Sequence, residues 1–219
     1  MARRFKKAKP LIYVFCEGES EQAYTDFLKW KFAGDAVIKR PSSVGLFEEA
    51  NSRFQKDPRF RNSADETDEI WFFFDVETKD VDKWDQRMKV IRKLRGLRKK
   101  TGIRVRLLMT TGCIEYWLML HYKMYTPSLQ SVAEKERVIA EVKLKEPAYS
   151  KGDYSSTARI AENYPKAVIN AEKTVHNLLL DGLPEMEDTD ERNRWLYTNC
   201  KTFSTVYEAI KYLESIKEA

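Results

Sequence analysis

Residues 69–75 read EIWFFFD, and this stretch decides the fold class because five consecutive apolar residues lie between two acids. Residues 11–16, LIYVFC, form a similar apolar run, and residues 103–109, IRVRLLM, alternate at first and then run apolar. Such runs are typical of strands that are covered on both faces of a parallel sheet. Between the second and third runs, apolar residues recur at helical spacing: Val81, Trp84, Met88, Ile91 and Leu94. This order of strand, helix and strand predicts an α/β fold, a small parallel sheet flanked by helices with right-handed crossovers.

The rest of the chain is interpreted outward from these runs. Ser20 and Ser43 are expected to cap helices that end near residues 32 and 56, and residues 36–39 form a short strand. Further helices are predicted over about 80–100, 114–122, 130–145, 155–163, 165–180 and 202–217, with residues 181–191 as a loop. We therefore expect a basic flexible tail (1–9), an α/β core (10–112) and a helical region packed on the core (113–219).

The net charge of +5 is a property of the tail. The first ten residues hold five bases and no acid, so the remaining 34 bases balance the 34 acids. Three widely spaced cysteines and two histidines argue against a disulfide framework and a zinc site. The sequence contains neither GxGxxG nor a P-loop, and no apolar run is long enough to span a membrane or serve as a signal peptide. These features predict a cytoplasmic protein with no membrane partner.

Acids follow two of the predicted strands. Glu17 comes directly after the first strand, and Asp75 and Glu77 end the second. Sites in open α/β sheets form outside the carboxyl ends of the strands, so these three carboxylates converge there if the two strands are neighbours. Clustered carboxylates repel one another and suit a hard cation, either Mg²⁺ or Mn²⁺. The alternative is that the acids simply lie in loops, and Glu19 and Glu21 are interpreted as acids favoured by the positive end of a helix.

Four segments resemble one known family. LIYVFCEGESEQAY (11–24) is similar to the opening of RloB-like proteins of the Toprim superfamily, in which a strand ends in an EG-x-[ST/K]-E-x-x-Y pattern. EIWFFFDVE (69–77) resembles the family's Asp-x-Asp strand, and TTGCIEYWLMLHY (110–122) its SNPxFExWLLxHF segment. NCKTFSTVYEAIKYL (199–213) is similar to the closing Asn-Pro-x-Thr helix. The resemblance spans nearly the whole chain after the tail.

The resemblance implies a Toprim fold and a metal-dependent nuclease from a prokaryotic anti-phage or restriction locus. Glu17 would then act as general acid or base or as a metal ligand, and Asp75 and Glu77 would hold Mg²⁺. Two departures stand out. The second acid is Glu77 rather than Asp, and Thr111-Gly112-Cys113 replaces the usual Ser-Asn-Pro. An inactive or weakened Toprim scaffold is therefore an open alternative.

Further candidates lie outside the acidic strand ends. Glu115 occupies an otherwise apolar helix, so it either belongs to the catalytic site or faces solvent at the first turn. His121 could contact a phosphate or serve as a hydrogen-bonded structural histidine. Residues 86–114 hold ten bases and no acid, which predicts either a solvated helix face or a phosphate-binding surface that includes Arg95, Arg98 and Lys99. Lys151 matches a YxK feature of the family and is a further phosphate-contact candidate.

The leading hypothesis is a Mg²⁺- or Mn²⁺-dependent nuclease that acts in antiviral defence on DNA or RNA, with Glu17, Asp75, Glu77 and Glu115 as catalytic residues. The first alternative is a non-catalytic nucleic-acid-binding or adaptor module of a defence complex. A phosphoryl- or nucleotidyl-transfer enzyme is a third. The substrate, a partner protein such as an ATPase, and self-association into a homo-oligomer stay open.

Overall fold

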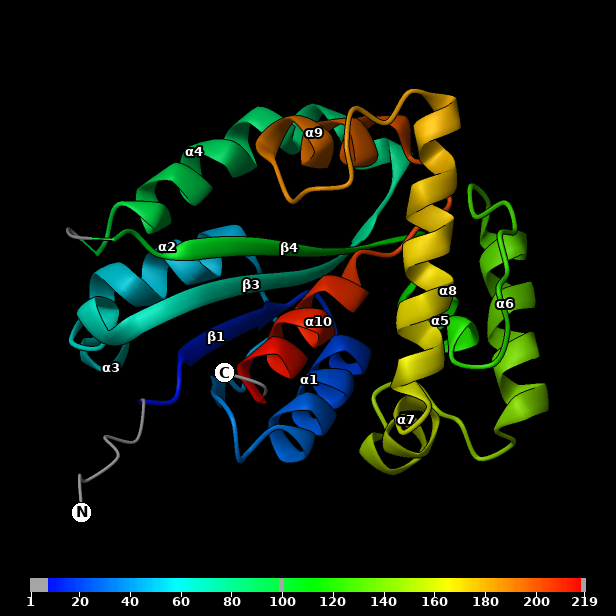
Figure 1. The fold of residues 1–219 in the computed structure, drawn as a ribbon, viewed down its shortest axis with the longest axis horizontal. Helices are drawn as coiled ribbons and strands as arrows, with labels where there is room; N and C mark the ends of the chain where they lie inside the picture. The colour runs from blue at the N-terminus through cyan, green and yellow to red at the C-terminus, as the bar shows by residue number, and fades with distance from the viewer. Residues whose placement is uncertain (1–7, 99–100, 218–219) are drawn as a thin grey trace, which may run out of the picture.

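The computed structural model describes residues 8–98 and 101–217. Its centre is a four-stranded sheet in the order β2-β1-β3-β4, in which every neighbouring pair is parallel. The strands are β1 (Leu11–Cys16), β2 (Val37–Lys39), β3 (Thr67–Val76) and β4 (Arg104–Thr111). The expected α/β fold with a small parallel sheet is confirmed (Figure 1).

Alternating side chains of β3 anchor a layer of helices on each face of the sheet. Phe72 stacks on Phe47 of α2 (Phe47–Lys56), with 4.1 Å between the ring centroids. On the other face, Phe73 makes an edge contact with Tyr24 of α1 (Glu19–Lys31). Because successive strand residues point to opposite faces, the buried run of β3 supports both layers at once. Asp75 follows Phe73 by two residues and therefore belongs to the face that α1 covers.

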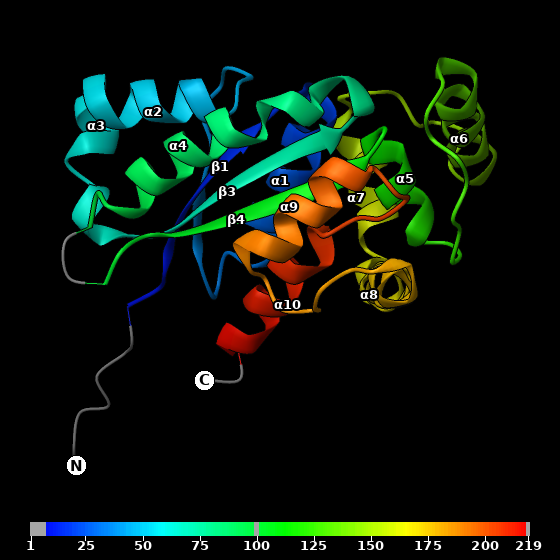
Figure 2. The ribbon, with the colours of Figure 1, turned by 90° about the horizontal axis from the view of Figure 1, so that it is seen from above.

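The remaining helices complete the two layers, as Figure 2 shows with α2, α3 and α4 on one side of the sheet and α8 and α10 on the other. Their bounds are α3 (Pro58–Arg61), α4 (Trp84–Arg95), α5 (Ile114–Leu120), α6 (Val132–Lys145), α7 (Tyr154–Ala161), α8 (Tyr164–Asn177), α9 (Asp190–Asn199) and α10 (Val206–Lys217). Three short 3₁₀ helices lie between them: η1 (Ala64–Glu66), η2 (Thr78–Lys83) and η3 (Leu178–Asp181).

Several helix ends differ from the sequence-based expectation. Neither Ser20 nor Ser43 caps a helix, since α1 begins after Gly18 and α2 after Leu46. The helix expected from residue 80 begins only at Trp84, after the 3₁₀ turn η2. The helix α9 was not predicted, because its sequence, DERNRWLYTN, carries few apolar residues at helical spacing.

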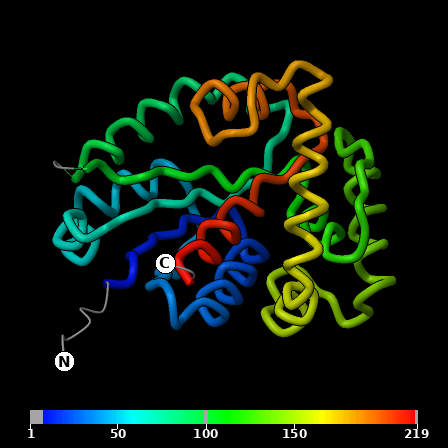
Figure 3. The backbone as a smooth tube through the Cα atoms, viewed as in Figure 1, coloured from blue at the N-terminus to red at the C-terminus, as the bar shows by residue number. Residues whose placement is uncertain are grey.

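The region after residue 113 packs on the sheet and its helices at several places. The helix α10 contacts β4, α7 contacts α1, and α9 contacts α4. Before α10, the Thr205 amide donates to the Met109 carbonyl at 2.8 Å, and the Thr111 amide donates to the Phe203 carbonyl at 3.0 Å. The chain thus returns along the end of β4 before it enters α10 (Figure 3). Of the predicted tail, residues 1–7 lie outside the described residues.

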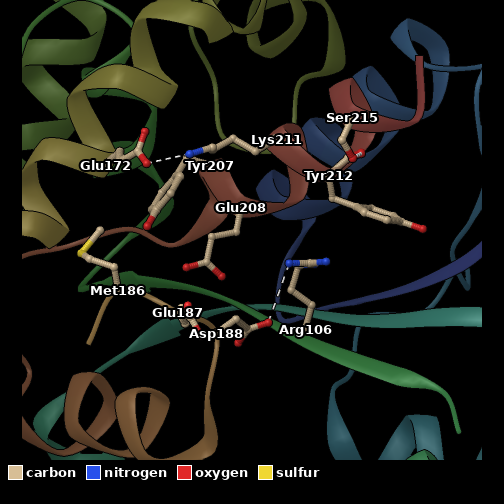
Figure 4. Close-up of a pocket in the computed structure, with 10 residues that line it drawn as sticks. All are labelled: Arg106, Glu172, Met186, Glu187, Asp188, Tyr207, Glu208, Lys211, Tyr212 and Ser215. Carbon is tan, nitrogen blue, oxygen red and sulfur yellow. Dashed lines mark hydrogen bonds and ion pairs between the residues drawn. The ribbon is translucent and has the colours of Figure 1, made fainter. Parts of the chain in front are cut away.

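A charged cavity of about 440 Å³ lies between β4, α8, α10 and the segment before α9 (Figure 4). Arg106 of β4 points toward Asp188, with 3.7 Å between Nη1 and Oδ2. Glu208 lines the same cavity, and its Oε1 accepts from Nη1 of the fully buried Arg192 at 2.6 Å. Arg106 lies near the amino end of β4, so this ion network is separate from the carboxyl ends of the strands.

None of the helices in the described ranges 8–98 and 101–217 is both long and apolar enough to cross a membrane.

Candidate active site

Glu17 and Asp75 meet at the carboxyl ends of β1 and β3. These strands are neighbours, and the Glu17 amide continues their ladder by donating to the Phe73 carbonyl at 3.0 Å. The Glu17 carboxylate accepts a hydrogen bond from the Asp75 amide, with 2.9 Å between Oε2 and N. The two acids that the sequence placed at adjacent strand ends are therefore in contact through one hydrogen bond.

The helix α1 adds a carboxylate that sequence reasoning assigned only to the helix terminus. Glu21 is 4% exposed, and burial raises its pKa to about 7, with the charges of Glu17 and Glu115 adding to the shift. A Cβ on Gly18 would lie 2.9 Å from Glu21 Oε2, so glycine leaves room for this carboxylate. Helical spacing could not have found this contact, because Glu17 precedes α1 and only the packing of α1 on the sheet brings Glu21 to the strand ends.

Glu115 completes the acidic cluster, which we define as Glu17, Glu21, Asp75 and Glu115. It is fully buried near the start of α5 rather than solvent-facing. Its Oε1 accepts from the Tyr149 hydroxyl at 3.0 Å and lies 3.4 Å from Lys151 Nζ. Its Oε2 is buried without a hydrogen-bond partner among the described residues. The structure thus brings Lys151, the candidate phosphate contact, next to Glu115, the candidate catalytic residue.

The electrostatics of Asp75 report on the whole cluster. Burial raises its pKa well above the usual value, and the charges of Glu21, Glu17 and Glu115 raise it further, while Lys135 opposes them. Its Oδ1 is buried and has no hydrogen-bond partner among the described residues. Mutual repulsion of this kind favours either a bound proton or a bound cation.

Glu77 is placed differently from the other acids. Its carboxylate pairs with Lys79 and with Lys135 of α6. Burial by itself raises the pKa of Glu77, but the two lysines together outweigh burial and leave the pKa below its usual value. The carboxylate that the resemblance assigns to metal is thus occupied by two ammonium groups.

Whether the cluster fits a divalent cation depends on its donors. In residues 8–98 and 101–217 no three His, Cys, Asp or Glu side chains stand close enough to hold a metal as they are placed. However, Asp75 Oδ1 and Glu115 Oε2 are orphaned carboxylate oxygens, and an unsatisfied buried acceptor is costly unless a cation or donor reaches it. Glu17 is exposed, and its carboxylate already lies at the Asp75 amide. The residues therefore fit a hard, oxygen-preferring cation such as Mg²⁺ or Mn²⁺.

Two of the three bases predicted to bind nucleic acid on the 86–114 segment form ion pairs. Arg95 forms a bidentate pair with Asp190 of α9, at 2.8 and 2.7 Å. Arg98 pairs with Asp68 at 3.0 Å. Lys99 lies outside the described residues. The acids that pair with these bases come from distant segments, so the uncompensated charge seen in sequence is partly compensated in the fold.

His121 lies in the core and away from solvent. It is fully buried, with Nε2 3.1 Å from the Tyr24 hydroxyl and Nδ1 3.0 Å from the Trp117 carbonyl oxygen. Burial lowers its pKa to about 4, against the opposing effect of its backbone hydrogen bonds. We therefore assign His121 the structural role that the sequence left open, and not a phosphate contact.

This burial predicts a pH-dependent loss of stability. Below about pH 6.5 the unfolded chain protonates His121 while the folded chain keeps it neutral, so stability falls as the pH drops toward 4. At pH 4.5 the expected cost is roughly 2 to 3 kcal/mol. Urea unfolding at pH 7 and 4.5 should show this part of the loss in the wild type but not in His121→Gln. Equal losses in both proteins would contradict the assignment, since the carboxylates titrate alike in each.

Glu21 has the opposite dependence. Its folded pKa of about 7 lies above the ordinary value of 4.5, so its contribution to stability is lost as the pH rises between these values. In EDTA at pH 8, Glu21→Gln is therefore expected to be more stable than the wild type by roughly 3 kcal/mol. At pH 5 the gain should shrink below about 1 kcal/mol. Glu19→Gln, an exposed neighbour, serves as the control for urea unfolding, and a destabilised Glu21→Gln at pH 8 would refute the raised pKa.

The family model described as RloB-like protein matches residues 12–213, which include every member of the acidic cluster. No curated protein and no solved structure gives a significant match to the chain. Since the family model covers most of the sequence, the chain belongs to the RloB-like protein family.

Proposed function

We propose that the chain is a metal-dependent nuclease with a Toprim-type centre that hydrolyses phosphodiester bonds of nucleic acid. The observation that carries this proposal is the convergence of Glu17, Glu21, Asp75 and Glu115 at the strand ends, with two buried carboxylate oxygens left unpartnered. The resemblance to prokaryotic defence proteins supports a cytoplasmic role in antiviral defence, alongside a partner such as an ATPase.

In this proposal Glu17, Glu21 and Asp75 would hold Mg²⁺ or Mn²⁺, and the buried Glu115 adds negative charge next to them. The bound cation would neutralise a phosphate and lower the pKa of a water molecule. Glu17 is the one exposed member of the cluster, so its carboxylate is positioned to accept the proton of the attacking water. The buried members keep fixed positions because α1, β3 and α5 hold them.

Two lysines flank the cluster and are suited to hold a phosphate. Lys135 reaches Glu77 from α6, and Lys151 reaches Glu115 from the segment before α7. The Gly152 amide donates to Ser20 Oγ at 3.1 Å, which fixes this segment against the start of α1. We therefore assign Glu77 to positioning Lys135 rather than to metal binding, and Lys151 to contact with the scissile phosphate.

The test is cleavage of a panel of nucleic acids by the purified chain. Single-stranded DNA, duplex DNA, tRNA and structured RNA are incubated with Mg²⁺ or Mn²⁺, with EDTA, and with the Glu17→Gln variant. We expect cleavage of at least one substrate that requires the metal and falls by about 100-fold or more in Glu17→Gln. Cleavage that persists unchanged in EDTA or in the variant would contradict the proposal.

One observation favours the alternative of a non-catalytic nucleic-acid-binding module. Glu77, the second acid of the Asp-x-Asp pattern, is already neutralised by Lys79 and Lys135, so its charge needs no metal ion. A module of this kind would bind nucleic acid in a salt-sensitive manner and keep that binding when Glu17 and Asp75 are both replaced by their amides. It would cleave no member of the panel.

A further inference from the structure

Two adjoining hollows form a groove at the edge of the sheet where β2 lies. One of about 720 Å³ is bordered by α1, the segment after β2, and the start of α7. The other, of about 530 Å³, lies between β2, α2 and α3. Lys29, Arg40 and Ser42 line both hollows, so the two are continuous. We call them together the β2 groove.

The β2 groove carries a surplus of positive charge. Five cations and no carboxylate line the second hollow: Lys29, Lys39, Arg40, Arg53 and Arg59. The three arginines are paired with acids, as Arg40 is paired at 2.6 Å with Asp26, which lines the first hollow. Lys29 and Lys39 are exposed and form no ion pair with any residue that the structure describes. These two ammonium groups are available to an anionic ligand.

Two aromatic side chains stand open to solvent in the same groove. Trp30 is 61% exposed and Tyr154 is 41% exposed, and both line the first hollow. They come from α1 and α7, which lie side by side (Figure 1). Large exposed aromatics beside unpaired cations are the elements with which proteins bind single-stranded nucleic acid, because bases stack on the rings while cations meet the phosphates. A duplex keeps its base faces covered and cannot use the rings in this way.

The segments that form the β2 groove are hydrogen-bonded to the segments that carry the acidic cluster. Gln22, the residue after Glu21, donates from Nε2 to the Ser42 and Ser43 carbonyls at 3.3 and 3.1 Å. The Gly45 amide donates to the Cys16 carbonyl at 2.8 Å, directly before Glu17. On the α7 side of the groove, Tyr154 lies three residues after Lys151, whose ammonium group is near Glu115. A strand lying in the groove is therefore brought to the cluster by the same segments that build the cluster.

From these contacts we propose that the β2 groove binds a single-stranded segment of nucleic acid, with bases stacked on Trp30 and Tyr154 and phosphates at Lys29 and Lys39. The proposal depends on the proposed function only where it names this single strand as the substrate of the nuclease. The nucleic-acid-binding surface then lies in the β2 groove, and not on α4 as the basic segment 86–114 predicts. It places the strand along α1, with one end at Glu17 and Glu21.

The test measures binding without cleavage. Fluorescence anisotropy in EDTA compares the full chain and its variants on labelled single strands of roughly 12 nucleotides, DNA and RNA, and on a duplex of equal length. Trp30→Ala and Tyr154→Ala are each expected to weaken single-strand binding about tenfold, and Trp30→Phe to recover most of it. The double variant Lys29→Ala/Lys39→Ala should lower the slope of log affinity against log salt by about 1 to 1.5. The duplex should bind about tenfold more weakly than the single strand.

Matched controls separate this surface from general charge. Lys89→Ala/Lys93→Ala removes two exposed bases of α4, and Leu180→Ala removes a side chain that is 92% exposed elsewhere. Both should stay within about twofold of the wild type. Single-strand binding that is insensitive to the aromatic variants, or equal affinity for the duplex, would overturn the proposal. Absence of any oligonucleotide binding would also overturn the proposal, and a protein partner would then be the alternative occupant of the groove.

The two proposals fail separately. Because the binding test contains no divalent cation, loss of binding in the groove variants supports the groove even if the chain cleaves nothing. Metal-dependent cleavage together with unaltered binding in the groove variants would reject the groove and retain the nuclease.

Discussion

Asp75→Asn is expected to lower metal-dependent cleavage by about three orders of magnitude, equivalent to ~4 kcal/mol of barrier. The substitution preserves the shape of the side chain and removes the charge that its buried Oδ1 would offer to a cation. The fold should tolerate it, because the repulsion from Glu21, Glu17 and Glu115 that raises the pKa of Asp75 is relieved when the side chain is neutral. Initial cleavage rates on the substrate found with the panel measure the expected loss of activity. Calorimetry of Mn²⁺ binding measures the expected loss of metal affinity.

The matched control for Asp75→Asn is Glu77→Gln. Glu77 is held by Lys79 and Lys135, so its loss should cost only about tenfold in rate through a misplaced Lys135. Mn²⁺ binding by Glu77→Gln should stay close to that of the wild type. If both variants lost activity and metal binding equally, Glu77 would be a metal ligand as the family resemblance implies, and the assignment of Glu77 to Lys135 would be wrong.

Arg192→Met is expected to lower the free energy of unfolding by about 3 to 5 kcal/mol, which is enough to unfold many domains. Arg192 has no exposed side-chain surface and donates to Glu208 Oε1 at 2.6 Å and to the Met186 carbonyl at 2.7 Å. Burial raises the pKa of Glu208, and Arg192 opposes that effect. Removing the arginine leaves a buried carboxylate, one oxygen of which already lacks a partner.

Two variants calibrate this prediction in urea unfolding. Arg194→Met, on the same helix but exposed, should change the free energy of unfolding by less than about 0.5 kcal/mol. The double variant Arg192→Met/Glu208→Gln should recover about half of the loss, because the neutral amide is cheaper to leave unpaired than a charge. A loss below about 1 kcal/mol in Arg192→Met would mean that the network around α10 contributes little to stability.

Local patterns were sufficient for the sheet and for its acidic edge. Residues 11–16 and 69–75 hold apolar runs that suit covered strands, and parallel strands end at the same edge of a sheet. The contact between Glu17 and Asp75, 58 positions apart, also requires β1 and β3 to be neighbours, and the sheet order supplies that. The helix α9 escaped prediction because its stability comes from packing against α4 rather than from its own pattern.

The sequence by itself thus determined a parallel α/β sheet with carboxylates at the ends of two strands. Only the tertiary structure decided that Glu21 joins them, that Glu77 pairs with Lys135, and that His121 is buried. Each of these outcomes depends on which helix packs where. Periodicity determines which face of a helix or strand is apolar. The partner of a charged group depends on contacts between distant segments, and these contacts form only when the helices pack on the sheet.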